Sequence, residues 1–331
     1  MKHVPFGTTG LHVSRLCLGT MTFGLQCDEA QGHAILDAAA AGGVDFLDLA
    51  DVYPLGGGME LAGRTEEIVG NWLRGRRHDY VVATKCAGAT GPKPWQRGTS
   101  RKHVLDAVEA SLRRLGTDYL DLYQLHSYDP DTPLDETLEA LDTVVRHGKA
   151  RYVGVSNWPA VKVARALGRS EVKNLVRIAS VQPRYNLLFR SFERDLLPLC
   201  AEEGIAVIPY NPLAGGLLTG KHDRAAPPPE DGRFRLGEAG PRYQDRYWND
   251  QSFDTTDALR GIAAEAGMSM TVMALRWVLS NPAVTAPIIG ASRPEQLSDS
   301  FRAAEEGVLP ADLKRRLDEA TRSWRLVDAE R

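Results

Sequence analysis

Residues 101–126 read RKHVLDAVEASLRRLGTDYLDLYQLH and contain one helix followed by one strand. In the first part, apolar side chains recur every three or four residues, which predicts an amphipathic helix over residues 101–115. Ser100 is placed to cap the start of this helix, and Gly116 is placed to end it. Residues 119–126 are almost continuously apolar, as is typical of a parallel strand covered on both faces. Such a unit is the building block of a parallel α/β protein.

The same alternation of an amphipathic helical pattern with a continuous apolar run extends through most of the chain. Seven further apolar runs are predicted strands, at residues 15–19, 44–50, 80–85, 152–156, 178–182, 206–210 and 287–290. Further helices are predicted at residues 28–41, 65–75, 133–146, 159–167, 192–203, 254–266, 270–280 and 294–304. A doubly wound sheet is the alternative, but the G-x-G-x-x-G fingerprint that it would carry after an early strand is absent from the chain. Eight units in about 300 residues therefore predict an α/β fold of the (β/α)8 TIM-barrel type.

Two stretches fall outside this alternation. Residues 3–5 and 11–13 flank Thr8-Thr9-Gly10, which predicts an N-terminal β-hairpin that plugs the bottom of the barrel. Residues 221–250 are rich in Pro, Gly, Arg and Asp and lie between two units, so we expect a long loop at the C-terminal face rather than a domain boundary. We expect residues 1–331 to form a single domain.

Composition excludes several classes of protein. Of the 331 residues, 43% are hydrophobic and the net charge is -3, so no basic excess points to nucleic acid or to an anionic membrane. No apolar stretch approaches the roughly 18 residues of a membrane span, and the opening MKHVPFG lacks the apolar region of a signal peptide. The four cysteines form no C-x-x-C pair, so we expect reduced thiols, no metal site and a cytoplasmic location.

Four polar side chains follow three consecutive predicted strands. Asp48 and Tyr53 come at and just after the end of the second strand, Lys85 ends the third and His126 ends the fourth. In a barrel of this type, function lies at the C-terminal ends of the strands. Neighbouring strands are about 4.8 Å apart, so these four side chains are expected within roughly 10 Å of one another. Each residue alone is common in packing or surface roles, and only their convergence indicates a site.

The chemistry of the four side chains fits together. A tyrosine is a weak acid, with an ordinary pKa of about 10, and a neighbouring ammonium lowers that pKa. Asp48 is placed to hold the Lys85 ammonium, and a neutral His126 is suited to orient a carbonyl oxygen by a hydrogen bond. The set predicts delivery of a proton to an oxygen on which negative charge develops, as in hydride addition to a carbonyl.

Three stretches resemble signatures of the aldo-keto reductase superfamily, in the branch of channel β subunits and general aldo-keto reductases. They are residues 46–53 (FLDLADVY), 118–126 (DYLDLYQLH) and 148–157 (GKARYVGVSN). The resemblance runs from Gly7 to about Phe301. It implies a catalytic tetrad of Asp48, Tyr53, Lys85 and His126, in which Tyr53 gives the proton, and a small carbonyl or alcohol as substrate.

The resemblance also implies the cofactor NADP(H), bound across the barrel mouth without a Rossmann domain. Ser156, Asn157 and Gln182 would hold the nicotinamide carboxamide, since amides and hydroxyls supply both donors and acceptors, and Tyr210 would stack on the ring. The other implied cofactor residues are Asp48, Gly19, Thr20 and Met21 near the first strands, Asn211, Leu213, Gly215 and Lys221 near the pyrophosphate, and Gly290, Ser292, Arg293 and Gln296 near the adenosine 2′-phosphate. Ser292 is also the expected N-cap of the helix over 294–304, whose N-terminus would favour an anion.

The sequence departs from the family pattern at two places. Leu49 stands where a threonine is usual, which we expect to alter packing more than chemistry. The stretch 54–64 lengthens the loop after Tyr53, so the substrates of well-studied relatives do not carry over to this chain. We expect Met21, Trp95, Trp158 and residues 221–250 to line the substrate pocket.

Other functions remain as alternatives or are excluded. Residues 215–221 (GGLLTGK) are close to a P-loop, but His222 follows where that motif needs Ser or Thr. A regulatory, NADPH-binding partner of the channel β-subunit type is the alternative from another class. Within enzymes, a dedicated keto-sugar reductase is the alternative to a general carbonyl reductase.

Overall fold

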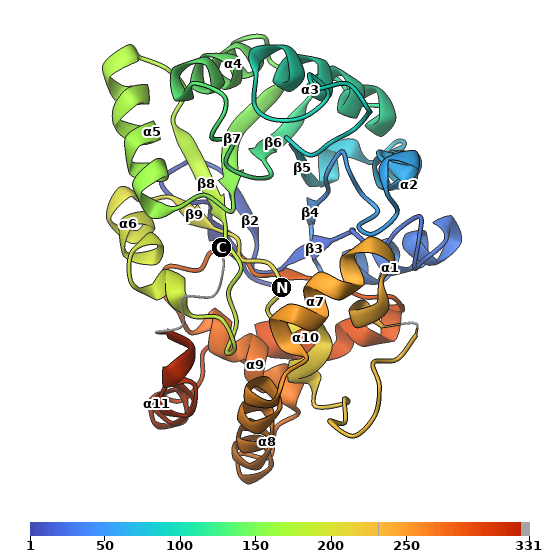
Figure 1. The fold of residues 1–331 in the computed structure, drawn as a ribbon, viewed down its shortest axis with the longest axis vertical. Helices are drawn as coiled ribbons and strands as arrows, with labels where there is room; N and C mark the ends of the chain where they lie inside the picture. Colours follow the sequence, from blue (N-terminus) through green and yellow to red (C-terminus); the bar gives the residue numbers. More distant parts are fainter. Residues whose placement is uncertain (231, 326–331) are drawn as a thin grey trace.

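Eight parallel strands curl into a barrel in the computed structural model, which describes residues 1–230 and 232–325 (Figure 1). In sheet order they are β10 (Ile288–Ile289), β3 (Cys17–Gly19), β4 (Phe46–Asp48), β5 (Val81–Cys86), β6 (Leu120–Leu125), β7 (Ala150–Ser156), β8 (Ile178–Gln182) and β9 (Ala206–Val207). Backbone hydrogen bonds of 2.8 Å from Thr285 N to Val207 O and from Ile288 N to Pro209 O join the two ends of the sheet. The predicted (β/α)8 barrel is confirmed.

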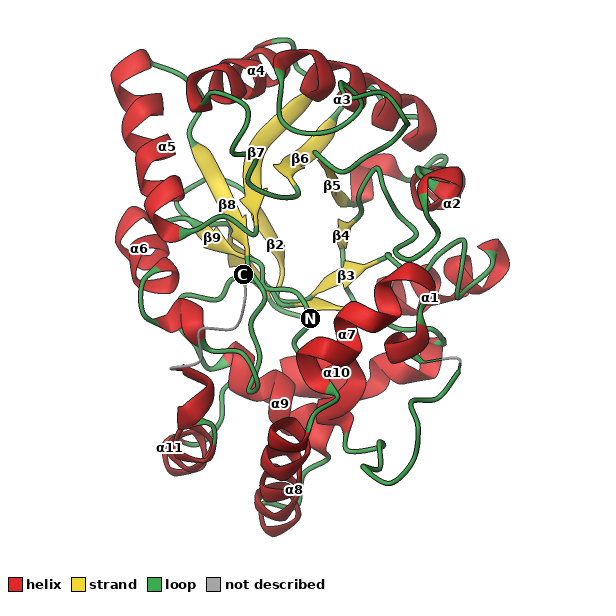
Figure 2. Cartoon of the chain, in the orientation of Figure 1, coloured by secondary structure: helices red, strands yellow, loops and turns green. Residues whose placement is uncertain are grey.

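Helices surround the strands on the outside of the barrel (Figure 2). They are α1 (Glu29–Ala41), α2 (Arg64–Leu73), α3 (Arg101–Leu115), α4 (Leu134–Arg146), α5 (Ala160–Lys173), α6 (Leu196–Glu203), α8 (Asp250–Glu265), α9 (Met270–Leu279) and α10 (Ser298–Glu306). The helix α3 has the predicted bounds, because the Ser100 hydroxyl accepts a hydrogen bond from His103 N and Gly116 ends it with a φ of 63°.

Several predicted boundaries were wrong for local reasons. The helix α5 passes Gly168 and ends at Asn174, which has a left-handed φ of 53°, so it is longer than predicted. The helix predicted over 192–203 begins only at Leu196, since residues 191–193 form a separate 3₁₀ turn and Asp195 caps the helix. Strand β4 is shorter than the predicted run 44–50, although Leu49 N and Asp51 N still bond to the neighbouring β5 carbonyls.

The segment 221–250 was predicted as a loop, and this was wrong for its last third. Residues Gly240–Tyr247 form the helix α7, with a proline in its first turn. Tyr243 and Tyr247, one helical turn apart, are both buried. Burial of these two rings stabilises a helix whose polar composition gives little sign of it. The last helix, α11 (Ala311–Ala320), is a further element that the sequence patterns did not predict.

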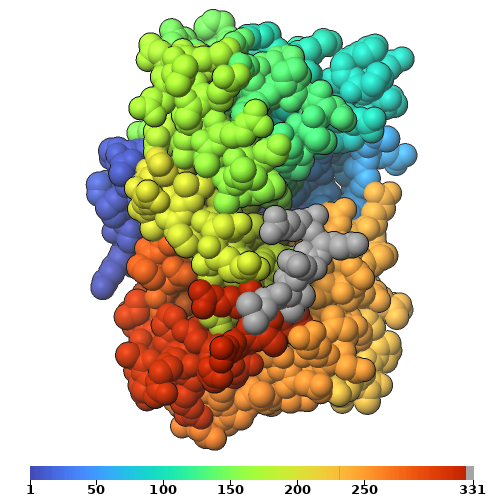
Figure 3. All heavy atoms as spheres, turned by 60° about the vertical axis from the view of Figure 1, so that its left-hand side comes forward, coloured from blue at the N-terminus to red at the C-terminus, as the bar shows by residue number. Residues whose placement is uncertain are grey.

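The N-terminal hairpin closes the bottom of the barrel, as predicted. Strands β1 (His3–Pro5) and β2 (His12–Ser14) pair antiparallel. Phe6, in the turn between them, is fully buried and meets Phe46 of β4 edge to face, with ring centroids 5.9 Å apart. In Figure 3 the hairpin, in blue, stands out on the side away from the orange segment that contains α7.

The side chains that point into the barrel change from apolar to polar between one inward position and the next on β4, β5 and β6. Phe46 of β4, Ala83 of β5 and Leu122 of β6 belong to one buried apolar cluster with Phe6. Side chains two positions apart lie on the same face of a strand, so the next inward positions are Asp48, Lys85 and Gln124. An apolar layer therefore supports a polar layer, which lies at the C-terminal ends of the strands.

No single helix in residues 1–230 and 232–325 is long and apolar enough to cross a membrane. The helices α8 and α9 reach that length and hydropathy only together, and the chain bends by 95° between them. The expectation of a single domain over residues 1–331 stays a prediction.

We expect the substitution Phe6→Ala to lower the free energy of unfolding by about 3–5 kcal/mol, because it leaves a cavity beneath the polar layer. Urea unfolding followed by circular dichroism measures this loss. Val161→Ala, at a side chain that is 64% exposed on α5, is the control and should change stability by less than about 0.5 kcal/mol. A loss below about 1 kcal/mol for Phe6→Ala would contradict the role of the hairpin as a packed plug.

Candidate active site

Three strand ends bring Asp48, Tyr53, Lys85 and His126 together. The Lys85 ammonium donates a hydrogen bond to Asp48 Oδ2 at 2.6 Å and lies 3.4 Å from the Tyr53 hydroxyl. The Tyr53 and His126 rings meet at right angles, with centroids 5.7 Å apart. The four residues thus lie as close together as the strand pattern predicted.

Asp48 accepts hydrogen bonds from two other side chains besides that of Lys85. Its other oxygen, Oδ1, accepts hydrogen bonds from Gln182 Nε2 at 2.8 Å and from Gln124 Nε2 at 3.2 Å. Gln124 is fully buried and was not singled out from the sequence. The signal was present, because Gln124 stands two residues after the buried Leu122 in an otherwise apolar strand. Both carboxylate oxygens are therefore fixed, which fixes the position of the Lys85 ammonium in turn.

Burial and charge act on the pKa values of the tetrad in opposite directions. Burial raises the pKa of Tyr53 above its usual value, and the positive charge of Lys85 works against this rise. The lowering expected from Lys85 is thus present but outweighed by burial. Burial disfavours the charged form of Lys85, but Asp48 and Tyr53 outweigh it and raise the pKa of Lys85. Burial, Lys85 and Arg242 lower the pKa of His126 to about 3, so its ring is neutral at ordinary pH.

A cleft of about 1270 Å³ opens over this polar layer, and Asp48, Tyr53 and His126 line it. The cleft is also lined by most of the residues that the family resemblance implied for a cofactor, namely Gly19, Met21, Ser156, Asn157, Gln182, Tyr210, Asn211, Leu213, Gly215, Lys221, Gly290, Ser292, Arg293 and Gln296. Thr20 does not line it, because its side chain is buried and donates to the Asp48 carbonyl at 3.0 Å.

The polar groups in the middle of the cleft are joined to one another. Asn157 has a left-handed φ of 57°, and its side-chain amide donates to the His126 carbonyl and to the Ser156 hydroxyl at 2.9 Å each. The Tyr210 hydroxyl donates to Asn157 Oδ1 at 2.9 Å. The Ser156 hydroxyl donates to the Gln182 carbonyl at 2.9 Å. These hydrogen bonds connect the side chains of Ser156, Asn157 and Tyr210 to one another and to the backbone of His126 and Gln182.

Three expectations about the cleft were wrong. Trp158 is buried against Tyr128, with ring centroids 5.1 Å apart, and Trp95 is half exposed, so neither lines the cleft. Ser292 is not a helix cap, because the segment that follows is a 3₁₀ turn at Pro294–Leu297 whose N-cap position is Arg293. The Ser292 backbone amide instead donates to Gln296 Oε1 at 2.9 Å.

The long loop after Tyr53 forms one wall of the cleft. Gly56, at a φ of 88°, lies against the Leu236 carbonyl, where an added Cβ would come within 2.7 Å of that oxygen. The Gly56 carbonyl accepts a hydrogen bond from Glu238 N at 3.3 Å. The loop and the segment 221–250 therefore meet through their backbones at the rim.

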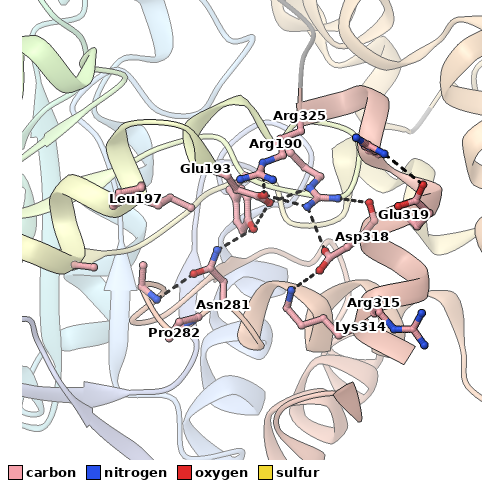
Figure 4. A pocket seen from close by; sticks show the side chains of 15 residues that line it. Arg190, Glu193, Leu197, Asn281, Pro282, Lys314, Arg315, Asp318, Glu319 and Arg325 are labelled. Atoms are coloured by element: carbon pink, nitrogen blue, oxygen red, sulfur yellow. Dashed lines mark hydrogen bonds and ion pairs between the residues drawn. The ribbon is translucent and has the colours of Figure 1, made fainter. Parts of the chain in front are cut away.

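A second pocket, of about 690 Å³, lies beside α6 and α11 and has no tetrad residue in its lining (Figure 4). Most of its charged groups are paired with one another. Arg190 lies 2.9 Å from Glu193 and 3.2 Å from Asp318, and Lys314 lies 2.7 Å from Asp318. The barrel mouth is therefore the stronger candidate for catalysis.

Comparison with known proteins gives a consistent result. Residues 15–322 match the sequence model described as the aldo/keto reductase family. The chain is 38% identical over 313 residues to "Uncharacterized oxidoreductase YrpG" of Bacillus subtilis, covering 92% of this chain and 91% of that protein. It is 37% identical over 310 residues to "Probable voltage-gated potassium channel subunit beta" of Arabidopsis thaliana, covering 92% of each chain. It is 37% identical over 325 residues to "Protein tas" of Escherichia coli, covering 91% of this chain and 92% of that protein.

One further carboxyl group lies behind the tetrad. Asp51 is 1% exposed, and its carboxylate oxygens have no hydrogen-bond partner among the described residues. Burial and the nearby Glu66 raise the pKa of Asp51 well above its usual range. Glu66 itself is bonded to Thr84 and Arg114. Asp51 therefore keeps its proton in the folded protein at pH values where it would lose it in the unfolded chain.

This raised pKa predicts how stability changes with pH. Above about pH 4, ionisation of Asp51 lowers the free energy of the unfolded chain but not that of the folded protein, so the native state loses stability until pH reaches the folded pKa. The variant Asp51→Asn lacks this loss. Its stability relative to the native protein should therefore rise as pH increases above about 4, by up to about 1.4 kcal/mol per pH unit, until the folded pKa is reached. Urea unfolding at each pH measures the difference. Asp131→Asn, at an exposed carboxylate, is the control and should change stability by less than about 0.5 kcal/mol at each pH. A flat line for Asp51→Asn would contradict the raised pKa.

Proposed function

The chain belongs to the aldo/keto reductase family, and we propose that it uses NADP(H) to reduce an aldehyde or ketone reversibly to an alcohol, with Tyr53 as the proton donor. The observation that supports this most is the buried chain Asp48–Lys85–Tyr53, whose hydroxyl end reaches the cleft beside a neutral His126. Carbonyl reduction needs a proton at the oxygen as the carbon receives hydride, and this arrangement is suited to supply it.

Each member of the tetrad has a distinct part in this proposal. Tyr53 holds the proton, since burial keeps its pKa above the ordinary value and the hydroxyl protonated at neutral pH. The Lys85 ammonium stabilises the tyrosinate that forms when the proton leaves. Asp48 keeps Lys85 charged and in place. The His126 ring, neutral and at right angles to Tyr53, is placed to donate a hydrogen bond to the carbonyl oxygen.

The donor set of the cleft fits a nicotinamide cofactor. Ser156, Asn157 and Gln182 offer hydroxyl and amide groups to the carboxamide, and Tyr210 offers an aromatic ring beside them. Lys221 and Arg293, at the phosphate-binding end that the family resemblance implies, supply positive charge. When bound, the nicotinamide supplies the hydride or accepts it. The residues around it bind and orient the two reactants.

A regulatory role is the second candidate, and its support is the similarity to a plant protein whose name describes a potassium channel β subunit. Turnover of a carbonyl compound by the purified chain with NADPH separates the two. An enzyme works without a partner protein, whereas a purely regulatory protein binds the cofactor and gives no sustained turnover.

We also propose a cytoplasmic location. The four cysteines, Cys17, Cys27, Cys86 and Cys200, are free and buried, which supports a reducing compartment.

The variant Tyr53→Phe should reduce carbonyl compounds roughly 10²–10⁴-fold more slowly, because it removes the proton donor and little else. The assay follows NADPH absorbance with an aromatic aldehyde. Binding of NADPH, measured by fluorescence titration, and the thermal melting curve are the controls, and both should be near those of the native protein. A variant with near-normal turnover would remove Tyr53 from the mechanism.

Arg293 is proposed to bind the 2′-phosphate that distinguishes NADPH from NADH. Its side chain is exposed and forms no ion pair within residues 1–230 and 232–325. A charge-assisted hydrogen bond contributes about 1.5–3 kcal/mol, so Arg293→Ala should weaken NADPH binding roughly 10- to 150-fold and leave NADH nearly unchanged.

Titration of both cofactors, at low and high salt, measures this effect, which should shrink with salt because Arg293 is exposed. The matched control is Arg302→Ala, an exposed arginine of α10 that is paired with Glu306. Equal losses for the two cofactors, or no loss for either, would reject Arg293 as the group that selects NADPH.

A further inference from the structure

The helix α7 brings two arginines to the wall of the cleft. Arg242 and Arg246 stand one helical turn apart, so they share a face of the helix, and both line the cleft. Tyr243, next to Arg242, is 4% exposed and anchors the helix. Figure 1 shows α7 in front of the strands, at the rim of the barrel.

Neither guanidinium has an anionic partner in residues 1–230 and 232–325. No salt bridge or hydrogen bond of the Arg242 or Arg246 side chain occurs there. Arg190, in the second pocket, shows the opposite situation, because Glu193 and Asp318 neutralise it (Figure 4). The third arginine of this wall, Arg233, contacts the Met21 sulfur and lies over the Tyr243 ring at 5.6 Å. The wall beside α7 thus carries positive charge that no described side chain neutralises.

Arg242 and His126 line the same cleft, and the charge of Arg242 is, after burial and Lys85, one of the causes that lower the pKa of His126. The charge of Arg246 likewise acts to lower the pKa of Tyr210, which burial raises. Four of the described residues that line the cleft are acidic. Asp48 is bonded to Lys85, and Glu295 and Asp299 are in the segment after β10. Glu238 comes from the same wall as Arg242, but no ion pair joins the two among the described residues.

We propose that the substrate is a carbonyl compound with a negatively charged group, a carboxylate or a phosphate, and that Arg242 binds that group. This inference rests on the proposed function, in which Lys221 and Arg293 serve the cofactor and Arg242 remains for the substrate. A guanidinium binds both kinds of anion through paired N–H donors, whereas a neutral aldehyde gains nothing from it. An unpaired guanidinium at the barrel mouth costs little free energy of folding, because Arg242 is exposed to water.

The test compares pairs of aldehydes in which one member carries an additional anionic group and the other is neutral. The pairs are 4-carboxybenzaldehyde with benzaldehyde, and glyceraldehyde 3-phosphate with glyceraldehyde, each assayed with NADPH. The native protein should show a higher kcat/KM for the charged member of at least one pair. The pair that shows the preference distinguishes a carboxylate from a phosphate. The preference should shrink with added salt.

The variant Arg242→Gln should lower kcat/KM for the preferred charged aldehyde roughly 10- to 150-fold, mainly through KM, and that for the neutral aldehyde by no more than a few-fold. Arg242→Lys should retain part of the preference, since it keeps the charge but not the fork of donors. The matched control is Arg235→Gln, at an arginine of the same segment that faces Glu230 at 3.7 Å and does not line the cleft. It should leave the preference unchanged.

Three outcomes would overturn the inference. The first is equal kcat/KM values for charged and neutral aldehydes in the native protein, and the second is an equal loss of kcat/KM for both in Arg242→Gln. The third is a weakened affinity of Arg242→Gln for NADPH in fluorescence titration, because that result would assign the arginine to the cofactor. A native protein that reduces none of the four aldehydes contradicts the proposed function instead, so the two failures are distinct.

Discussion

The ammonium of Lys85 has no exposed surface, and the arrangement of the whole site follows from that. A buried charge costs several kcal/mol unless partners compensate it. Lys85 Nζ makes three contacts, to Asp48 Oδ2 at 2.6 Å, to the Leu49 carbonyl at 2.7 Å and to the Tyr53 hydroxyl at 3.4 Å. An ammonium has three donors, so all of them are used. Asp48 and the Leu49 carbonyl make the two shorter contacts and compensate most of this charge, while the longer contact couples the proposed proton donor Tyr53 to Lys85.

The position of this charge is set by the alternation of side chains along the strands. Phe46, Ala83 and Leu122 fill the interior below it, and Phe6 of the hairpin closes that layer from beneath. The amide groups of Gln124 and Gln182 complete the polar layer by bonding to Asp48. A buried charge on an apolar floor keeps its field strong, because water does not screen it from below.

The sequence predicted those parts of the molecule in which one local pattern decides the structure. Continuous apolar runs identified the eight strands, and polar residues at their ends identified the tetrad. The helix α7 escaped prediction because only Tyr243 and Tyr247 are buried in it, within a segment of polar and helix-breaking residues. Trp158 was assigned to the cleft, yet it packs on Tyr128, since an aromatic residue after a strand serves either purpose. The pKa of Tyr53 depends on how deeply the ring is buried, which no spacing along the chain records.

The helix α7 lies outside the alternation of strands and helices that builds the barrel. It packs on the turns on either side of it, its Tyr247 hydroxyl accepts hydrogen bonds from Asn186 and Asn211, and its residues reach the cleft from outside the sheet. Asp48 and Lys85 belong to β4 and β5, Tyr53 and His126 follow β4 and β6, and all four are far from α7 in the sequence. Under the proposed function, the ends of the strands supply the chemistry and α7 supplies contacts to the substrate. Replacement of the segment that contains α7 would then change which compounds bind without changing the tetrad, a route open both to natural divergence and to protein engineering.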